Sequence, residues 1–183
     1  MMTKLFAILM LCSVTLGLAN AAPEDGGQLY TAYNLWYEKP NKIMAMNYTV
    51  GTMIPAGSKV TFLKTKDGRS PYLQIQTEAG IELTIYMQTK YWPGVTIETV
   101  KDRLLTTKTF DELTKGFTKE ELAAIKTGEV VTGMSKAAVH VVLGYPPTHM
   151  TPSDDTNPWM FWRNRFARRA IEFGTDGKVS AIR

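Results

Sequence analysis

Turn-forming residues recur so often between residues 28 and 87 that only short strands fit between them. Proline and glycine at these places suit tight turns and hairpins, and the turn clusters are Lys39-Pro40-Asn41, Pro55-Ala56-Gly57, Asp67-Gly68 and Glu78-Ala79-Gly80. The segments around them are rich in aromatic and β-branched residues and cover 29–37, 43–50, 58–64, 72–77 and 81–87. Strands of this length and spacing predict a small β-barrel or a strongly bent sheet.

Beyond residue 95 the apolar residues follow a helical period. A first helix is expected within residues 96–105, where the apolar positions are Ile97, Val100 and Leu104. Thr118 and Glu121 form a capping-box pattern ahead of a second helix, and Gly128 is the residue type that commonly ends one. A third helix should begin near Ser135 and end at Gly144, with an apolar stripe of Ala138, Val139, Val142 and Leu143.

The end of the chain returns to strands, which are expected at 159–166, 168–173 and 178–183. Gly174-Thr175-Asp176-Gly177 supplies the turn between the last two. Helices grouped before an antiparallel meander predict an arrangement in which one layer covers the other. The predicted fold class is therefore α+β: a small N-terminal β-barrel followed by a helix-helix-three-stranded antiparallel sheet unit.

Residues 1–21 have the features of a secretory signal peptide. Lys4 supplies a positive charge, residues 5–18 are largely apolar, and Ala19-Asn20-Ala21 offers small residues for cleavage after Ala21. The apolar run is shorter than the roughly 20 residues that a membrane-spanning helix needs, so no transmembrane span is expected in the mature chain. Leu11 stands where a lipidation signal needs a small residue before Cys12. We therefore expect a free periplasmic protein, with lipidation at Cys12 and outer-membrane association as open alternatives.

Several short motifs of the C-terminal part follow one another in a fixed order. They are Gly133-Met134-Ser135, Val139, Leu143-Gly144-Tyr145-Pro146, residues 159–162, Ile171-Glu172-Phe173 and Gly177-Lys178-Val179. This ordered set resembles the SmpA/OmlA (BamE-like) domain family. The resemblance implies two helices packed on a three-stranded sheet, and a non-catalytic role that supports insertion of β-barrel proteins into the outer membrane.

By its strand count, the N-terminal part is similar to a bacterial SH3-type barrel. Such barrels often bind through exposed aromatic residues, and the candidates here are Tyr30, Tyr33, Trp36, Tyr37 and Tyr48. Most of them are more simply explained as barrel core. The expected organisation is a signal peptide at 1–21, a β-rich SH3-like region at 22–95, a helical connector at 96–129 and a BamE-like domain at 130–183.

Residue types that carry catalysis or bind cofactors are sparse. The chain has two histidines, His140 and His149, and neither has a second ligand at metal-binding spacing. The acidic pairs Glu120-Glu121 and Asp154-Asp155 are neighbours in sequence that do not share a helix face, so we expect solvated surface. The sequence therefore predicts no enzyme, no cofactor and no metal.

An aromatic and basic cluster near the C-terminus is the better candidate for a functional surface. Strand alternation places Trp159, Phe161, Arg163 and Arg165 on one face, and Met160, Trp162 and Phe166 on the other. One face must cover the helices, and aromatic residues beside arginines on the opposite face are typical of protein interfaces. We take Trp159, Phe161, Arg163 and Arg165 as the candidate partner-binding surface, the alternative being that the tryptophans are core and the arginines a solvated edge.

These observations predict an envelope protein that supports outer-membrane assembly or envelope integrity by binding envelope or outer-membrane proteins. The alternative, from another class, is a module that binds a cell-wall peptide or inhibits an enzyme. A formal net charge of +4 is too mild to indicate nucleic acid as a partner.

Overall fold

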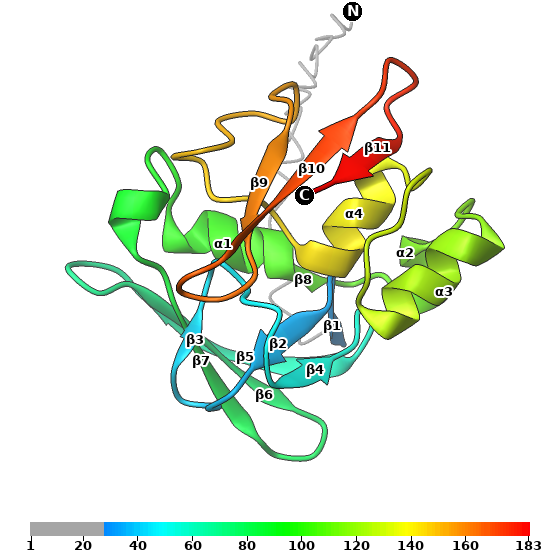
Figure 1. The fold of residues 1–183 in the computed structure, drawn as a ribbon. Helices are drawn as coiled ribbons and strands as arrows, with labels where there is room; N and C mark the ends of the chain where they lie inside the picture. Colours follow the sequence, from blue (N-terminus) through cyan, green and yellow to red (C-terminus); the bar gives the residue numbers. More distant parts are fainter. Residues whose placement is uncertain (1–27) are drawn as a thin grey trace, which may run out of the picture.

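The computed structural model describes residues 28–183, which contain four α-helices, a six-stranded sheet, a three-stranded sheet and a two-stranded ribbon (Figure 1). The predicted signal peptide and Cys12 lie outside the described residues. The expected α+β class is confirmed, with a strongly curled, half-barrel sheet in the N-terminal part.

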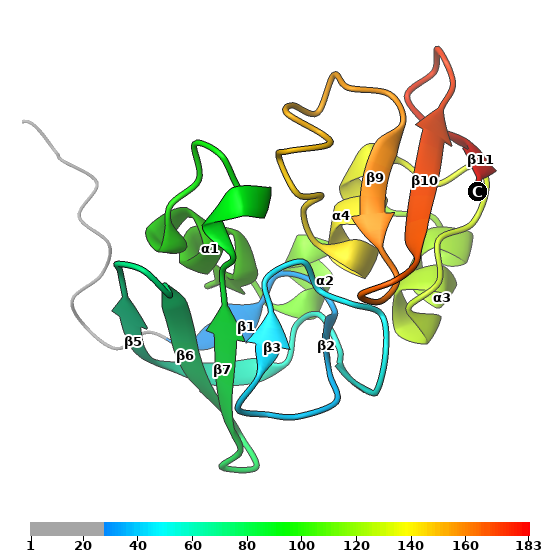
Figure 2. The ribbon, with the colours of Figure 1, turned by 60° about the vertical axis from the view of Figure 1, so that its left-hand side comes forward.

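The six-stranded sheet forms the N-terminal half. Its order is β3 (Ile43–Met44), β7 (Glu82–Tyr86), β6 (Tyr72–Thr77), β5 (Lys59–Lys66), β1 (Leu29–Thr31) and β8 (Leu105–Thr106). Neighbouring strands are antiparallel except β3 and β7, which are parallel. Helix α1 (Ile97–Leu104) lies against this sheet in Figures 1 and 2, and its Ile97, Val100 and Leu104 enter the same core as the strands.

Two of the expected strands in the N-terminal half are much shorter than the sequence predicts. Segment 29–37 divides into β1 and β2 (Leu35–Tyr37), because β2 pairs with β4 (Thr52–Ile54) in the separate ribbon. Segment 43–50 is extended only at β3, since the Asn47 N–H donates to the Met44 carbonyl at 2.8 Å and Asn47 has a φ of 50°. Neither β4 nor β8 was expected.

The C-terminal half has its own core. Helices α3 (Lys119–Thr127) and α4 (Lys136–Leu143) pack against an antiparallel sheet of order β11 (Val179–Ile182), β10 (Arg168–Phe173) and β9 (Trp159–Trp162). Strand β9 ends four residues earlier than expected, and short helix α2 (Phe110–Leu113) was not expected. In the chain, these two helices precede the three strands of the antiparallel sheet.

Helix ends are set by the side chains that the sequence indicates. Thr96 and Ser135 cap α1 and α4, and Thr118 with Glu121 forms a complete capping box on α3. Gly128 ends α3 with a φ of 73°, in the left-handed region where glycine is favoured. The expectation that Glu121 is solvated surface is wrong, because this residue is 7% exposed and its carboxylate caps helices.

Buried asparagines join the two halves. The Asn34 side chain donates to the Ile125 carbonyl and accepts from the Ala56 N–H, both at 2.8 Å. The Asn47 amide donates to the Leu143 carbonyl at 3.0 Å and to the Asn34 carbonyl at 2.7 Å. Residues 96–129 are divided between the halves, since α1 and β8 belong to the first core and sheet and α3 to the second core.

Candidate functional site

The predicted partner-binding residues do not lie on one surface. Trp159 is fully buried and Phe161 is 4% exposed, so both are core residues, and the prediction that they are displayed is wrong. Alternation along β9 is as expected, but the helices cover the face that carries these two aromatic side chains. The Trp159 ring centroid lies 4.5 Å from that of His140 and 4.7 Å from that of Phe173.

The opposite face of β9 is also partly covered. Trp162 is half-buried and packs against the core of the N-terminal half, with its ring centroid 6.1 Å from that of Tyr91. Within β9 the alternation therefore separates the two faces correctly, but neither face is left as an open sheet surface.

Arg163 and Arg165 are exposed, and they lie in the turn between β9 and β10. We call residues 163–168 the β9–β10 tip. Its backbone is held by Asn164, whose Oδ1 accepts from the Phe166 and Ala167 N–H groups at 2.8 and 2.9 Å. The Arg163 N–H also donates to the Ala167 carbonyl at 2.9 Å. The turn is therefore an ordered platform.

Phe166 is the most exposed of the large apolar side chains in residues 28–183, with 80% of its surface accessible. The Arg165 guanidinium lies 4.3 Å from the centre of its ring, and the Arg168 guanidinium lies 5.3 Å from the ring of Trp162. Within the described residues, Arg163, Arg165 and Arg168 form no ion pair. The tip therefore combines an exposed aromatic ring with uncompensated positive charge.

Arg169 lies behind the tip and differs from its neighbours. Burial lowers the pKa of its guanidinium, the carboxylate of Glu129 opposes this change, and Arg163 adds to it. Arginine keeps its proton at any physiological pH even so, so Arg169 adds a fixed positive charge beneath the exposed arginines.

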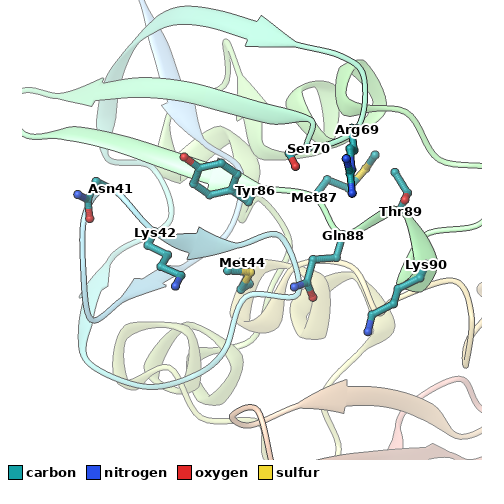
Figure 3. Close-up of a pocket in the computed structure, with 10 residues that line it drawn as sticks. All are labelled: Asn41, Lys42, Met44, Arg69, Ser70, Tyr86, Met87, Gln88, Thr89 and Lys90. Atoms are coloured by element: carbon teal, nitrogen blue, oxygen red, sulfur yellow. The ribbon is translucent and has the colours of Figure 1, made fainter.

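A second feature is an open pocket of about 510 Å³ on the N-terminal half. We call it the basic pocket; its lining residues are Asn41, Lys42, Met44, Arg69, Ser70, Tyr86, Met87, Gln88, Thr89 and Lys90 (Figure 3). They come from β3 and the turn before it, the β5–β6 turn, the end of β7 and the single 3₁₀ turn η1 (Thr89–Tyr91). In Figure 3 the side chains of Lys42, Arg69 and Lys90 surround those of Met44 and Gln88.

Sequence reasoning missed the basic pocket for a physical reason. Its three cationic residues are 27 and 21 positions apart in the chain, at 42, 69 and 90, and the curl of the sheet brings them together. Each stands singly in or beside a turn, where a lone basic residue is ordinary surface. No local spacing marks them as a group.

His140 is packed into the structure, whereas His149 is exposed in the loop before β9, with its Nδ1 3.1 Å from the Tyr91 carbonyl oxygen. His140 lies between Tyr145 and Trp159, and its Nδ1 is 3.1 Å from the Gly144 carbonyl oxygen. Burial lowers the pKa of His140, although the Gly144 carbonyl and Asp154 oppose this change. A smaller cavity of about 280 Å³ lies beside it at the junction of the two halves. His140 therefore lies at the edge of the core. The part of the chain that is described has no group of acidic, cysteine and histidine residues that could hold a metal.

The N-terminal aromatics are mostly built into the fold. Tyr33 is buried in the core, while Tyr30, Trp36, Tyr37 and Tyr48 are half-buried. No row of exposed aromatic rings therefore marks the curled sheet as a peptide-binding surface.

Comparisons of the chain with protein-family models, with curated proteins and with solved structures give no match. Among residues 28–183, none of the helices has the length and apolar character needed to cross a bilayer.

Proposed function

We propose that this chain is an exported, non-catalytic envelope protein that acts by binding a protein partner, and that the β9–β10 tip is the centre of its docking surface. The observation that carries the proposal is Phe166, an aromatic side chain 80% exposed on an ordered turn with arginines on both sides. The resemblance of the C-terminal part to the SmpA/OmlA family, and the order α3, α4, β9, β10, β11, support an assembly or integrity role in the periplasm.

The composition of the tip supports binding to a protein. Aromatic residues and arginine are enriched at protein interfaces, and lysine and acidic residues are depleted there. The tip carries Phe166 and three arginines and no lysine or acidic residue. Because Asn164 already fixes the turn, little conformational entropy is lost when a partner covers it.

A site-specific photocrosslink tests the proposal. A photoreactive phenylalanine analogue at position 166 should crosslink an outer-membrane or barrel-assembly protein in intact envelopes. The same analogue at Phe62, a 37% exposed phenylalanine on β5, is the matched control and should not. Phe166→Ser with Arg165→Ser should reduce recovery of that partner by about tenfold, an effect of ordinary size for one interface hot spot.

Two other results would contradict the proposal. Equal crosslinking from positions 62 and 166 would show that the tip has no special role. Retention on purified cell wall, with no outer-membrane protein captured, would favour a cell-wall-binding module.

A further inference from the structure

We propose that the basic pocket binds a small organic polyanion, about the size of a disaccharide or dipeptide, with at least two carboxylate or phosphate groups. The first argument is charge. The chain as a whole is nearly balanced, with 21 basic and 17 acidic residues, but the pocket lining contains three basic residues and no acidic one. Like charges gathered around one concave surface repel each other and focus a positive potential there.

The three cations have no internal partner that would explain their grouping. Within residues 28–183, none of Lys42, Arg69 and Lys90 forms an ion pair. Lys90 lies over the Tyr91 ring, with its Nζ 4.6 Å from the ring centre, a cation–π contact that leaves its positive charge without a counter-ion. All three residues are exposed, so their charges are available to a ligand.

The remaining lining residues indicate what the anion is attached to. Ser70, Thr89, Asn41 and Gln88 provide hydroxyl and amide groups for neutral polar atoms. An apolar wall that suits a carbon skeleton is formed by Met44, Tyr86 and Met87. A volume of about 510 Å³ is in the range of small-molecule sites and far exceeds what one phosphate needs. An organic polyanion therefore fits better than a bare inorganic ion.

The walls of the pocket are fixed by backbone hydrogen bonds. The Met87 N–H donates to the Pro71 carbonyl at 2.9 Å, which ties the β5–β6 turn to the end of β7. The Thr84 N–H donates to the Pro40 carbonyl at 2.8 Å and the Ala45 N–H to the Tyr86 carbonyl at 2.9 Å, which tie β3 and its preceding turn to β7. A preformed site loses less entropy on binding.

Arg69 and the two lysines of the pocket bind anionic groups in different ways. The guanidinium fork of Arg69 binds carboxylate or phosphate oxygens in pairs, whereas Lys42 and Lys90 act as point charges. Two or more separated anionic groups are needed to engage the charges of Lys42 before β3, Arg69 in the β5–β6 turn and Lys90 in η1 together. The basic pocket shares no residue with the β9–β10 tip, so this inference stands independently of the proposed function.

Titration calorimetry with the mature chain tests the inference, with citrate as the carboxylate probe, fructose 1,6-bisphosphate as the phosphate probe and trehalose as the neutral control. Binding of either anion with no binding of trehalose supports it, and the preferred anion identifies the group recognised. Affinity should fall several-fold when sodium chloride is raised from about 0.05 M to about 0.5 M. Amide NMR shifts should concentrate in residues 41–44, 69–70 and 86–90.

Variants locate the site. Lys42→Gln, Arg69→Gln and Lys90→Gln together should weaken binding by at least about tenfold. The matched control replaces the exposed lysines Lys115, Lys119 and Lys126 by glutamine, which removes the same charge near α3 and should change affinity by less than about twofold. Arg69→Gln alone serves if the triple variant folds poorly. Equal loss in both triple variants, equal binding of trehalose, or no binding of either anion at about 10 mM would overturn the inference.

Discussion

Glu121 is the residue whose replacement tests the packing of the C-terminal half most directly, because one carboxylate caps two helices. Its Oε2 accepts from the Thr118 N–H at 2.9 Å, which completes the capping box at the start of α3. Its Oε1 accepts from the Ser135 N–H at 2.8 Å and from the Ser135 hydroxyl at 2.7 Å. Since Ser135 caps α4, the carboxylate joins the N-termini of both helices.

The size of the effect follows from these contacts. Burial by itself would raise the pKa of Glu121, but the hydrogen bonds from Ser135 and Thr118 outweigh it and hold the pKa below its usual value. Hydrogen bonds to a charged group stabilise by about 1.5–3 kcal/mol each. Glu121→Gln keeps the shape and one acceptor oxygen but turns an amide toward the donors of one helix. We expect the free energy of unfolding to fall by about 2–3 kcal/mol and Tm by about 4–12 °C.

Urea unfolding followed by circular dichroism measures this loss. A carboxylate with a depressed folded-state pKa contributes stability above its unfolded pKa of about 4.3 and loses it as the pH falls through the folded value. The difference in the free energy of unfolding between the wild type and Glu121→Gln should therefore have its full size at pH 7 and shrink below about pH 4. Glu112→Gln is the control. Glu112 completes the equivalent capping box on α2 but is exposed, so this substitution should lower the free energy of unfolding clearly less. A difference below about 0.5 kcal/mol at pH 7, or one that persists unchanged in acid, would refute the reasoning.

Three further predictions follow from burial. Trp159→Ala should lower the free energy of unfolding by about 3–5 kcal/mol in urea titrations, because the side chain is fully buried, whereas Phe166→Ser should change it by less than about 0.5 kcal/mol. Asn34→Ala should lower the free energy of unfolding by about 1–3 kcal/mol, since it leaves the buried Ala56 N–H without its acceptor and removes one of the two donors to the Ile125 carbonyl; a loss below about 0.5 kcal/mol would contradict the network. Burial lowers the pKa of His140 despite the nearby Asp154, so the wild type should lose stability as the pH falls below about 6.5, the unfolded value. In His140→Phe, which keeps the ring packing, the fall in the urea midpoint between about pH 7.5 and pH 5.5 should be smaller; an unchanged fall would count against this assignment.

Local signals predicted α1, α3 and α4, but α2 was missed although Thr109 and Glu112 form a capping box at its start. The boundaries of α3 and α4 are encoded by neighbouring residues: a capping residue at the start and a glycine with positive φ after the end. The turn glycines and prolines likewise placed β6 at 72–77 without error. These features depend on interactions within a few residues, which the sequence contains in full.

The arrangement of the strands depends on distant residues and was harder to predict. Nothing near Leu35 shows that the chain leaves one sheet for another there. The bend is held by the Asn34 side chain, which accepts from the Ala56 N–H and donates to the Ile125 carbonyl. For β9, alternation separated the two faces but carried no information on which face the helices cover. Trp159 was therefore predicted to be displayed although it is buried. Phe166, beyond the end of the strand, was assigned to the covered face although it is exposed.

The junction between the halves explains why surfaces on both can be treated as parts of one body. An apolar junction tolerates sliding, because dispersion contacts have no fixed direction, whereas a buried amide keeps its hydrogen bonds only in one geometry. Asn47 accepts from the Trp36 N–H at 3.0 Å and donates to the carbonyls of Asn34 and Leu143. A shift of α4 against the sheet would therefore leave buried polar groups without hydrogen-bond partners in both halves. Each buried polar group left without a partner lowers the free energy of unfolding by about 1–3 kcal/mol, a large part of the stability of a chain this size. The network therefore fixes the orientation of the two cores, and with it the relative placement of the basic pocket and the β9–β10 tip.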